Sequence, residues 1–171
     1  MTQMAVRPIV LLGDSILRQK AVKVSRFDNS IQELIDDMID TMKAAPGLGL
    51  AAPQVGVPLR IVVVDVEDRL YVLCNPEIVE SEGEYEPEEG CLSIPGYVAN
   101  VKRAQKVTVK AKNRRGKQIK IKAEGLLAHV IQHELDHLDG ILFIDRLASM
   151  DLLRKVPAQA VGEAEAVEVE T

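Results

Sequence analysis

Tryptophan is absent from this chain of 171 residues, aromatic residues make up only 3% of it, and cysteine occurs twice. No apolar stretch approaches the roughly 18 residues of a membrane span, and the run from Ile9 to Leu12 is too short for a secretory signal. These absences predict a cytoplasmic protein without membrane contact. Because thiols stay reduced in the cytoplasm, Cys74 and Cys91 are interpreted as buried residues, metal ligands or nucleophiles rather than as a disulfide.

Apolar residues make up 47% of the chain, which at this length is enough for one compact domain with a buried core. The net charge is −5, and residues 158–171 contribute four Glu and no Lys or Arg. We therefore predict a single domain over residues 1–157 and an acidic, low-complexity tail over residues 158–171.

Hydrophobic periodicity and turn residues predict an α+β domain. The expected elements are an amphipathic helix over 31–42, strands over 59–66 and 69–76, a hairpin over 106–122 and a helix over 125–140. Ser30 and Glu33 form a possible capping box before the first helix, and Pro76 is expected to end the second strand. Mixed or antiparallel strands would pack around the second helix, which is apolar over most of its circumference and therefore buried.

Ten Lys or Arg and no acidic residue lie between Lys102 and Lys122. Two interpretations stay open for this basic hairpin. It can be a solvated face that discourages edge pairing, or it can meet an anionic partner such as RNA.

All three histidines of the chain lie in the second predicted helix. His133 and His137 are one turn apart and about 40° round the helix axis, so both rings can reach one metal ion. Glu134, the next residue along, leans over the same ion as a general base. The pattern therefore predicts a catalytic metal site, which needs a third protein ligand.

Three candidates for the third ligand fail on the sequence itself. The extended HExxHxxGxxH pattern of one protease family requires a histidine where this chain has Phe143. A downstream glutamate would have to come from Glu163 or beyond, in the acidic tail. His129 lies eight residues from His137, about 12 Å along the helix axis, which is too far to share one ion.

Cys91 remains, within the sequence EEGCLS. Gly90 before it lets the backbone pass close to a neighbour, so a thiolate can project toward a cation. The predicted metal ligands are therefore Cys91, His133 and His137.

The segment GLGLAAPQ, from Gly47 to Gln54, makes neither a good helix nor a good strand. Its glycines indicate backbone that lies very close to something, although the pattern alone also fits a loop packed on the core. Gln54 is a neutral donor in an apolar stretch, a group suited to stabilising an oxyanion.

GLGLAAPQ, EEGCLS and QHELDH, in this order and at these separations, closely resemble the three signature motifs of the bacterial peptide deformylases. The similarity extends from residue 12 to residue 147. It implies that the three predicted ligands hold a divalent metal, whose bound hydroxide attacks the formyl carbon of an N-formylmethionyl peptide. Glu134 would take the proton of the water and pass it to the leaving amine, and Gln54 with the Leu92 N–H would hold the oxyanion.

The resemblance also implies how the peptide is held. Backbone groups of Leu48, Gly49 and Gly90 would pair with the extended peptide as with an added strand. The methionine pocket would be bordered by Leu126, His129 and Val130.

Softness and geometry of the donor set suit zinc, whereas the resemblance implies Fe(II) as the native metal, with Zn, Ni or Co as substitutes. It further implies that the partners are nascent formylated chains. Relatives from enteric bacteria carry a longer basic C-terminal helix that is thought to dock on the ribosome, whereas Met150–Lys155 gives only a short helical stretch. We therefore assign a transient ribosome contact to the Lys102–Lys122 hairpin, without sequence-specific nucleic acid binding.

Two other functions use the same residues. A metallopeptidase would cut unblocked or internal amides with His133, Glu134 and His137. A non-enzymatic module would close its metal site with a fourth protein ligand, for which Cys74 is the available thiol.

Overall fold

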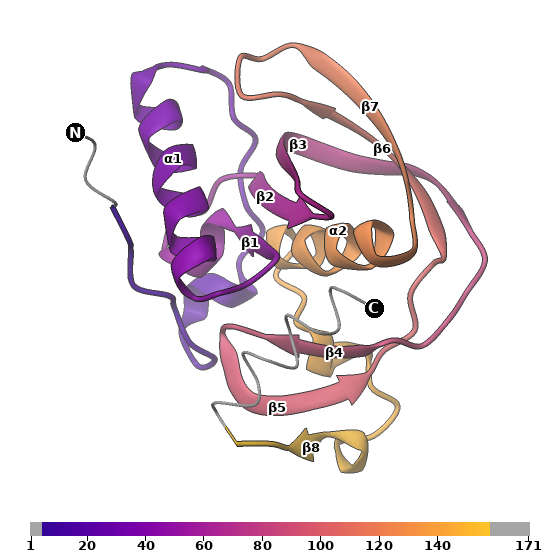
Figure 1. The fold of residues 1–171 in the computed structure, drawn as a ribbon. Coiled ribbons are helices and arrows are strands. Elements are labelled where there is room, and N and C mark those ends of the chain that lie inside the picture. Colours follow the sequence, from indigo (N-terminus) through magenta and orange to yellow (C-terminus); the bar gives the residue numbers. More distant parts are fainter. Residues whose placement is uncertain (1–4, 158–171) are drawn as a thin grey trace.

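The computed structural model describes residues 5–157, so the predicted acidic tail lies outside the described residues. Over these residues, two antiparallel sheets and two α-helices form an α+β fold, which confirms the predicted fold class (Figure 1). Within the described residues, no helix is both long enough and apolar enough to cross a membrane.

The larger sheet has the strand order β1-β2-β3-β6-β7 and the smaller one β4-β5-β8. The elements are α1 (Asn29–Ala44), β1 (Gly49–Ala51), β2 (Ile61–Val66), β3 (Arg69–Glu82), β4 (Glu88–Cys91), β5 (Ile94–Asn100), β6 (Lys106–Lys112), β7 (Gln118–Glu124), α2 (Gly125–Leu138) and β8 (Arg154–Lys155). Short β1 and β4 are edge strands of different sheets, and α2 lies between the two sheets (Figure 1).

The larger sheet is covered on both faces, which explains the continuous apolar run of β2. Val62 and Val64 pack in a cluster with residues of α2, whereas Ile61 and Val63 pack in a second cluster with residues of α1. A strand buried on both faces loses the apolar and polar alternation of a half-exposed strand. The helix α2 is therefore fixed against the sheet, and its opposite side faces β4.

The start of α1 differs from the prediction. The N-cap is Asp28, whose carboxylate accepts a hydrogen bond from the Ile31 N–H at 3.2 Å. Ser30 already lies inside the helix and donates its hydroxyl to Asp28 at 2.6 Å. The capping box of Ser30 and Glu33 is therefore wrong, because Asp28 has the extended backbone that an N-cap residue needs.

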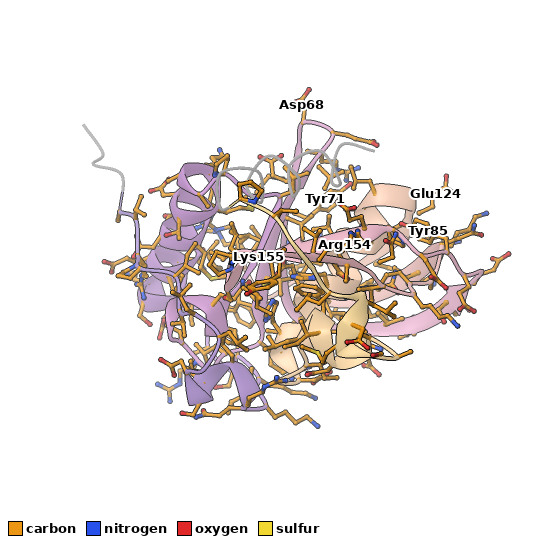
Figure 2. The ribbon with its side chains drawn as sticks, turned by 90° about the horizontal axis from the view of Figure 1, so that it is seen from below. Asp68, Tyr71, Tyr85, Glu124, Arg154 and Lys155 are labelled. Atoms are coloured by element: carbon orange, nitrogen blue, oxygen red, sulfur yellow. The ribbon has the colours of Figure 1, made fainter. Side chains whose placement is uncertain are left out.

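The strand β3 does not end at Pro76. It continues to Glu82, with a shift in the pairing register between Cys74 and Glu77. A proline lacks the N–H of a regular ladder, and a bulge tolerates this loss. At the other end of β3, Glu67 and Asp68 both have positive φ, as the twist of a tight hairpin turn favours, and Figure 2 shows Asp68 protruding at its tip.

Both ends of α2 are tied to other segments. The hydroxyl of Tyr85 donates to the carbonyl of Gly125 at 3.0 Å, and Figure 2 shows Tyr85 and Glu124 at this side of the molecule. At the C-terminal end, Gly140 has φ +73°, and a Cβ there would lie 2.5 Å from the Arg18 carbonyl oxygen. Glycine is therefore required at the turn that ends the histidine-bearing helix.

The segment Met150–Lys155 and the basic hairpin each differ in part from expectation. Met150–Leu152 forms one short 3-10 turn, and the following β8 is a strand that pairs with β5 rather than part of a helix. The predicted hairpin is formed by β6 and β7, but β6 also pairs with β3, which places Glu82 opposite Lys106. An acidic residue of β3 therefore lies beside the basic hairpin, whose neighbours are not only solvent and other basic residues.

Candidate metal centre

The fold brings together the three residues that the sequence predicts as metal ligands. Cys91 ends β4, whereas His133 and His137 project from α2. One ligand atom of each residue lies within 4.8 Å of those of the other two, and Sγ of Cys91 lies 3.4 Å from Nε2 of His137. All three side chains are buried, with exposed fractions of 1%, 6% and 1%.

The surroundings of Cys91 are apolar on the side of the smaller sheet. The thiol belongs to a buried cluster that includes Ile94, Leu142 and Phe143. Phe143, the residue that replaces the third histidine of the extended protease pattern, also has its ring 6.5 Å from that of His133. The cluster shields one side of the centre from water, which strengthens electrostatic interactions there.

His133 is oriented by Glu89. Its Nδ1 lies 2.6 Å from Oε1 of Glu89, so that this nitrogen donates to the carboxylate and Nε2 is left for a metal. Nε2 is buried and has no hydrogen-bond partner among residues 5–157. A divalent metal at this position would satisfy the buried nitrogen, and two imidazoles with one thiolate form a donor set that suits zinc or iron.

A chain of buried charges supports Glu89. Arg103 donates to both oxygens of Glu89, at 2.7 and 2.8 Å, and also to Asp136 at 2.7 Å. Asp136 in turn accepts two hydrogen bonds from Arg146, at 2.6 and 2.7 Å. The sequence analysis missed this network, although Glu89 lies inside EEGCLS and Asp136 inside QHELDH.

Electrostatics at the centre favour a bound cation. Burial by itself would raise the pKa of Glu89, but the positive charges of His133 and Arg103 outweigh it and hold this pKa well below its usual range. Burial would lower the pKa of His133, yet the charge of Glu89 outweighs it and raises this pKa well above its usual value. The carboxylate that favours a proton on the ring also favours a metal ion at Nε2. Burial, with the nearby charge of His133, lowers the pKa of His137 and keeps that ring neutral.

Glu134 lies directly against β1. A Cβ added to Gly49 would fall 2.6 Å from Oε2 of Glu134 and 2.8 Å from Cγ1 of Val130. Any side chain at position 49 would therefore displace the carboxylate that follows His133. This contact explains the close backbone approach expected from the glycines of GLGLAAPQ.

Gln54 reaches the centre from the short 3-10 turn Ala52–Val55 that follows β1. Its side-chain oxygen accepts a hydrogen bond from the Ala51 N–H at 2.9 Å, which fixes the orientation of the amide. The amide nitrogen therefore points toward the centre, where it donates to the Ser93 hydroxyl at 3.2 Å and lies 3.7 Å from Sγ of Cys91.

The remaining predicted residues are buried to different extents. Leu92 follows Cys91 in the β4–β5 turn and is partly buried, as are Leu48 and Leu126, while Gly90 is buried. His129 is buried, with Nε2 3.4 Å from the Glu89 oxygen that also contacts His133 and its ring 6.5 Å from that of Tyr85.

Cys74 takes no part in the metal centre. It is fully buried in the apolar cluster that contains α1. The group of possible metal ligands found among residues 5–157 contains only Cys91, His133 and His137. A closed site with Cys74 as fourth ligand is therefore not formed in the described part of the chain.

This chain is similar to proteins named peptide deformylases. Residues 6–152 match the family model described as polypeptide deformylase. A peptide deformylase from Heliobacterium modesticaldum is 55% identical over 144 residues, which is 84% of this chain and 95% of the relative. The crystal structure of a peptide deformylase from Legionella pneumophila is 50% identical, with a TM-score of 0.84 and 93% of this chain and 94% of that chain covered. A class I type b peptide deformylase from Acinetobacter baumannii, solved with Met-Ala-Ser bound, is 35% identical, with a TM-score of 0.82 and 85% of this chain and all of that chain (100%) covered.

Proposed function

The chain belongs to the polypeptide deformylase family, and from this premise we propose that it removes the formyl group from N-formylmethionine of newly synthesised polypeptides and releases formate. The observation that carries the proposal is the convergence of Cys91, His133 and His137 beside a buried carboxylate and an oriented amide. No contact in the described residues favours the metallopeptidase alternative over this one.

One divalent metal per chain would be held by Cys91, His133 and His137. We propose Fe(II) as the native metal, with Zn, Ni or Co as substitutes that the same donors accept. When bound, such a metal lowers the pKa of water to about 7 and so provides a nucleophile at neutral pH.

Glu134 is the proposed general base and acid. Its position beside His133 and against Gly49 holds the carboxylate between α2 and β1, the edge strand on which we propose that the substrate lies. There it takes a proton from the attacking water and returns it to the amine that leaves. General acid–base catalysis of this kind contributes about 10²–10⁴-fold to a rate.

Two donors are proposed to hold the oxyanion. The amide nitrogen of Gln54 faces the centre because its oxygen is fixed by the Ala51 N–H. The backbone N–H of Leu92 follows the ligand Cys91 directly. Donors fixed before the reaction stabilise the developing charge without reorganising, and removal of one costs about 2.7–4 kcal/mol.

The formylated peptide is proposed to lie as an added strand between the two sheets. The edge strands β1 and β4 carry Gly49 and Gly90, and together with Leu48 they offer backbone groups to an extended peptide. We propose a methionine pocket bordered by Leu126, Val130 and His129, where His129 contributes least because its ring faces Glu89. The Met-Ala-Ser bound to the Acinetobacter relative supports a site for the N-terminal methionine of peptides.

Residues 1–157 are proposed to form the single catalytic domain of a cytoplasmic enzyme, with the acidic tail outside it. A transient contact with the ribosome through the basic hairpin remains part of this proposal, without sequence-specific binding of nucleic acid.

The proposal is tested by measuring formate release from formyl-Met-Ala-Ser with protein purified without oxygen. Acetyl-Met-Ala-Ser serves as the matched blocked peptide, and unblocked Met-Ala-Ser tests for the metallopeptidase. We expect formate from the formyl peptide, no acetate from the acetyl peptide and no cleavage of unblocked Met-Ala-Ser. Cleavage of the unblocked peptide with no release of formate would overturn the proposal.

A further inference from the structure

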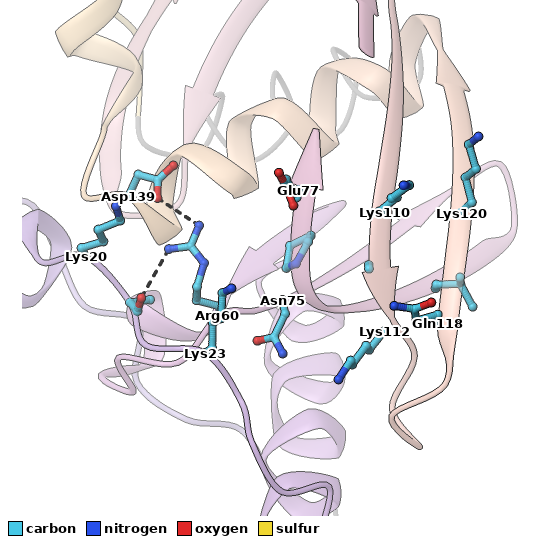
Figure 3. A pocket seen from close by; sticks show the side chains of 14 residues that line it. Lys20, Lys23, Arg60, Asn75, Glu77, Lys110, Lys112, Gln118, Lys120 and Asp139 are labelled. Carbon is cyan, nitrogen blue, oxygen red and sulfur yellow. Dashed lines mark hydrogen bonds and ion pairs between the residues drawn. The ribbon is translucent and has the colours of Figure 1, made fainter. Parts of the chain in front are cut away.

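A cavity of about 910 Å³ lies away from the metal centre, and none of the three proposed ligands lines it. Its walls are formed by the segment before α1, by β3 and by the hairpin of β6 and β7 (Figure 3). Arg60, just before β2, and Asp139, just after α2, complete them. The labelled polar side chains in Figure 3 stand around this open groove. We call it the basic groove.

The basic groove gathers positive charge. Six basic and two acidic side chains line it: Lys20, Lys23, Arg60, Lys110, Lys112, Lys120, Glu77 and Asp139. Arg60 is already engaged, because it donates to Asp139 at 2.9 Å and to the carbonyl of Leu138 at 2.9 Å. Five lysines then face a single remaining carboxylate, that of Glu77.

None of these five lysines makes an ion pair with any group in residues 5–157. Lys112 lies over the ring of Phe27, at 5.9 Å from its centroid, a contact that leaves its charge unneutralised. Like charges gathered around one groove repel each other, and without a carboxylate partner they create a positive field over it. A polyanion would relieve this repulsion and release the counterions of both surfaces.

The opposite end of the same hairpin provides the contrast. A second cavity there is lined by two lysines and three glutamates, namely Lys106, Lys122, Glu80, Glu82 and Glu124. Lys106 lies 3.8 Å from Glu124, and the nearby Lys102 lies 3.7 Å from Glu84. Six of the ten basic residues therefore fall into a neutralised end, with Lys102, Lys106 and Lys122, and an unneutralised end, with Lys110, Lys112 and Lys120.

Arg114 at the tip of the hairpin belongs to neither end. Its guanidinium donates to Gln32 at 2.8 Å and to Asp36 at 2.7 Å, which anchors the tip to α1. A substitution at Arg114 would disturb this anchor, so it is a poor probe of partner binding.

We propose that the basic groove binds the phosphate backbone of helical RNA without reading its sequence. Lysine is a compact point charge suited to single phosphate oxygens. No aromatic side chain lines the groove, so it offers no platform on which unpaired bases would stack, and this favours a duplex over a single strand. The choice of RNA rests on the proposed function, because formylated chains emerge from ribosomes, whose surface is rich in helical RNA.

Two triple variants with the same change in net charge test this proposal. Lys110, Lys112 and Lys120 are replaced by Glu in the first, and Lys102, Lys106 and Lys122 in the second. Affinity for a fluorescent RNA hairpin is measured by anisotropy over a series of salt concentrations, with melting temperatures as a check on folding. A third variant with Gln at 110, 112 and 120 removes the charges without adding repulsion.

We expect the groove variant to lose about tenfold or more in affinity and its salt slope to fall by up to about three, since each of the three lost phosphate contacts contributes about 0.9 to that slope. The matched variant should stay within about threefold, and all variants should release formate as the unmodified chain does. An equal loss in both Glu variants would assign the effect to net charge and overturn the groove.

Binding of the unmodified chain to vesicles of anionic phospholipid, with none to RNA at low salt, would also overturn the proposal. Formate release in the same samples separates the two proposals. An unmodified chain that releases formate but does not bind RNA contradicts the groove alone, whereas an unmodified chain that releases no formate contradicts the proposed function.

Discussion

The metal centre and the basic groove both gather charged side chains, but in opposite ways. At the metal centre, Glu89, Arg103 and Asp136 are buried, and each pairs with a group of opposite charge. In the groove, lysines such as Lys110 and Lys120 are exposed and make no ion pair within residues 5–157. A buried charge must be paired because its desolvation costs several kcal/mol, whereas water solvates an exposed one. The first arrangement holds side chains rigidly, and the second leaves charge available to a partner.

The largest expected difference between the two regions lies in catalysis. Glu134→Gln keeps the shape of the side chain but removes the proton acceptor, so we expect formate release to fall by about 10²–10⁴-fold. The matched groove variant Lys112→Gln should leave the rate unchanged. The two proteins should contain the same amount of metal. If Glu134→Gln had lost its metal, its low rate would not support Glu134 as the general base.

The next largest difference between the two regions is expected in how far a substitution lowers the free energy of unfolding. Arg103→Met leaves Glu89 and Asp136 buried without this partner, and breaking such a pair costs about 3–5 kcal/mol of unfolding free energy. Lys110→Met on the exposed wall of the groove should change the same free energy by less than about 0.5 kcal/mol. Urea denaturation of both variants provides the measurement, and similar losses would contradict the contrast between buried and exposed charge.

Metal affinity tests the orienting role of Glu89. Glu89→Gln keeps a hydrogen-bond acceptor for Nδ1 of His133 but removes the charge that favours a cation at Nε2. We expect metal affinity to fall by about 10–100-fold. Glu77→Gln in the groove is the matched control and should bind metal normally. Competition with a coloured chelator measures both, and unchanged affinity in Glu89→Gln would remove Glu89 from the account.

The smallest effect on metal binding is expected from a substitution of Cys74, which is buried and belongs to neither the metal centre nor the basic groove. Burial raises the pKa of its thiol to about 11, so it should not react with iodoacetamide in the folded protein at pH 8. Cys74→Ser should retain one metal per chain, whereas Cys91→Ser should not. Loss of metal in the Cys74 variant would revive the closed structural site.

The sequence contained enough information to predict the fold class and the residues that meet at the metal centre. His133 and His137 are joined by helical spacing alone, and apolar periodicity predicted the buried stripe of α1 from Ile31 to Met42. These features depend on local geometry, which the spacing of residues expresses directly.

What the sequence could not provide depends on contacts between distant segments. Arg103 looked like one member of a basic run, yet it is buried between Glu89 and Asp136, which lie 14 and 33 residues away. The pairing register of β3 with β6 likewise placed glutamates beside lysines of the hairpin. Asp28 capped α1 in place of Ser30 because the entering backbone, rather than the motif, decides which residue is the cap.

The most direct test of the central claim is an oxygen-free titration of the metal-free chain with Fe(II), with formate release from formyl-Met-Ala-Ser measured at each point. We predict that the rate rises in proportion to added metal, levels off at one metal per chain, and does not rise in Cys91→Ser. A metal-free chain as active as the loaded one, or a Cys91→Ser variant that responds to Fe(II) like the unmodified chain, would contradict the account.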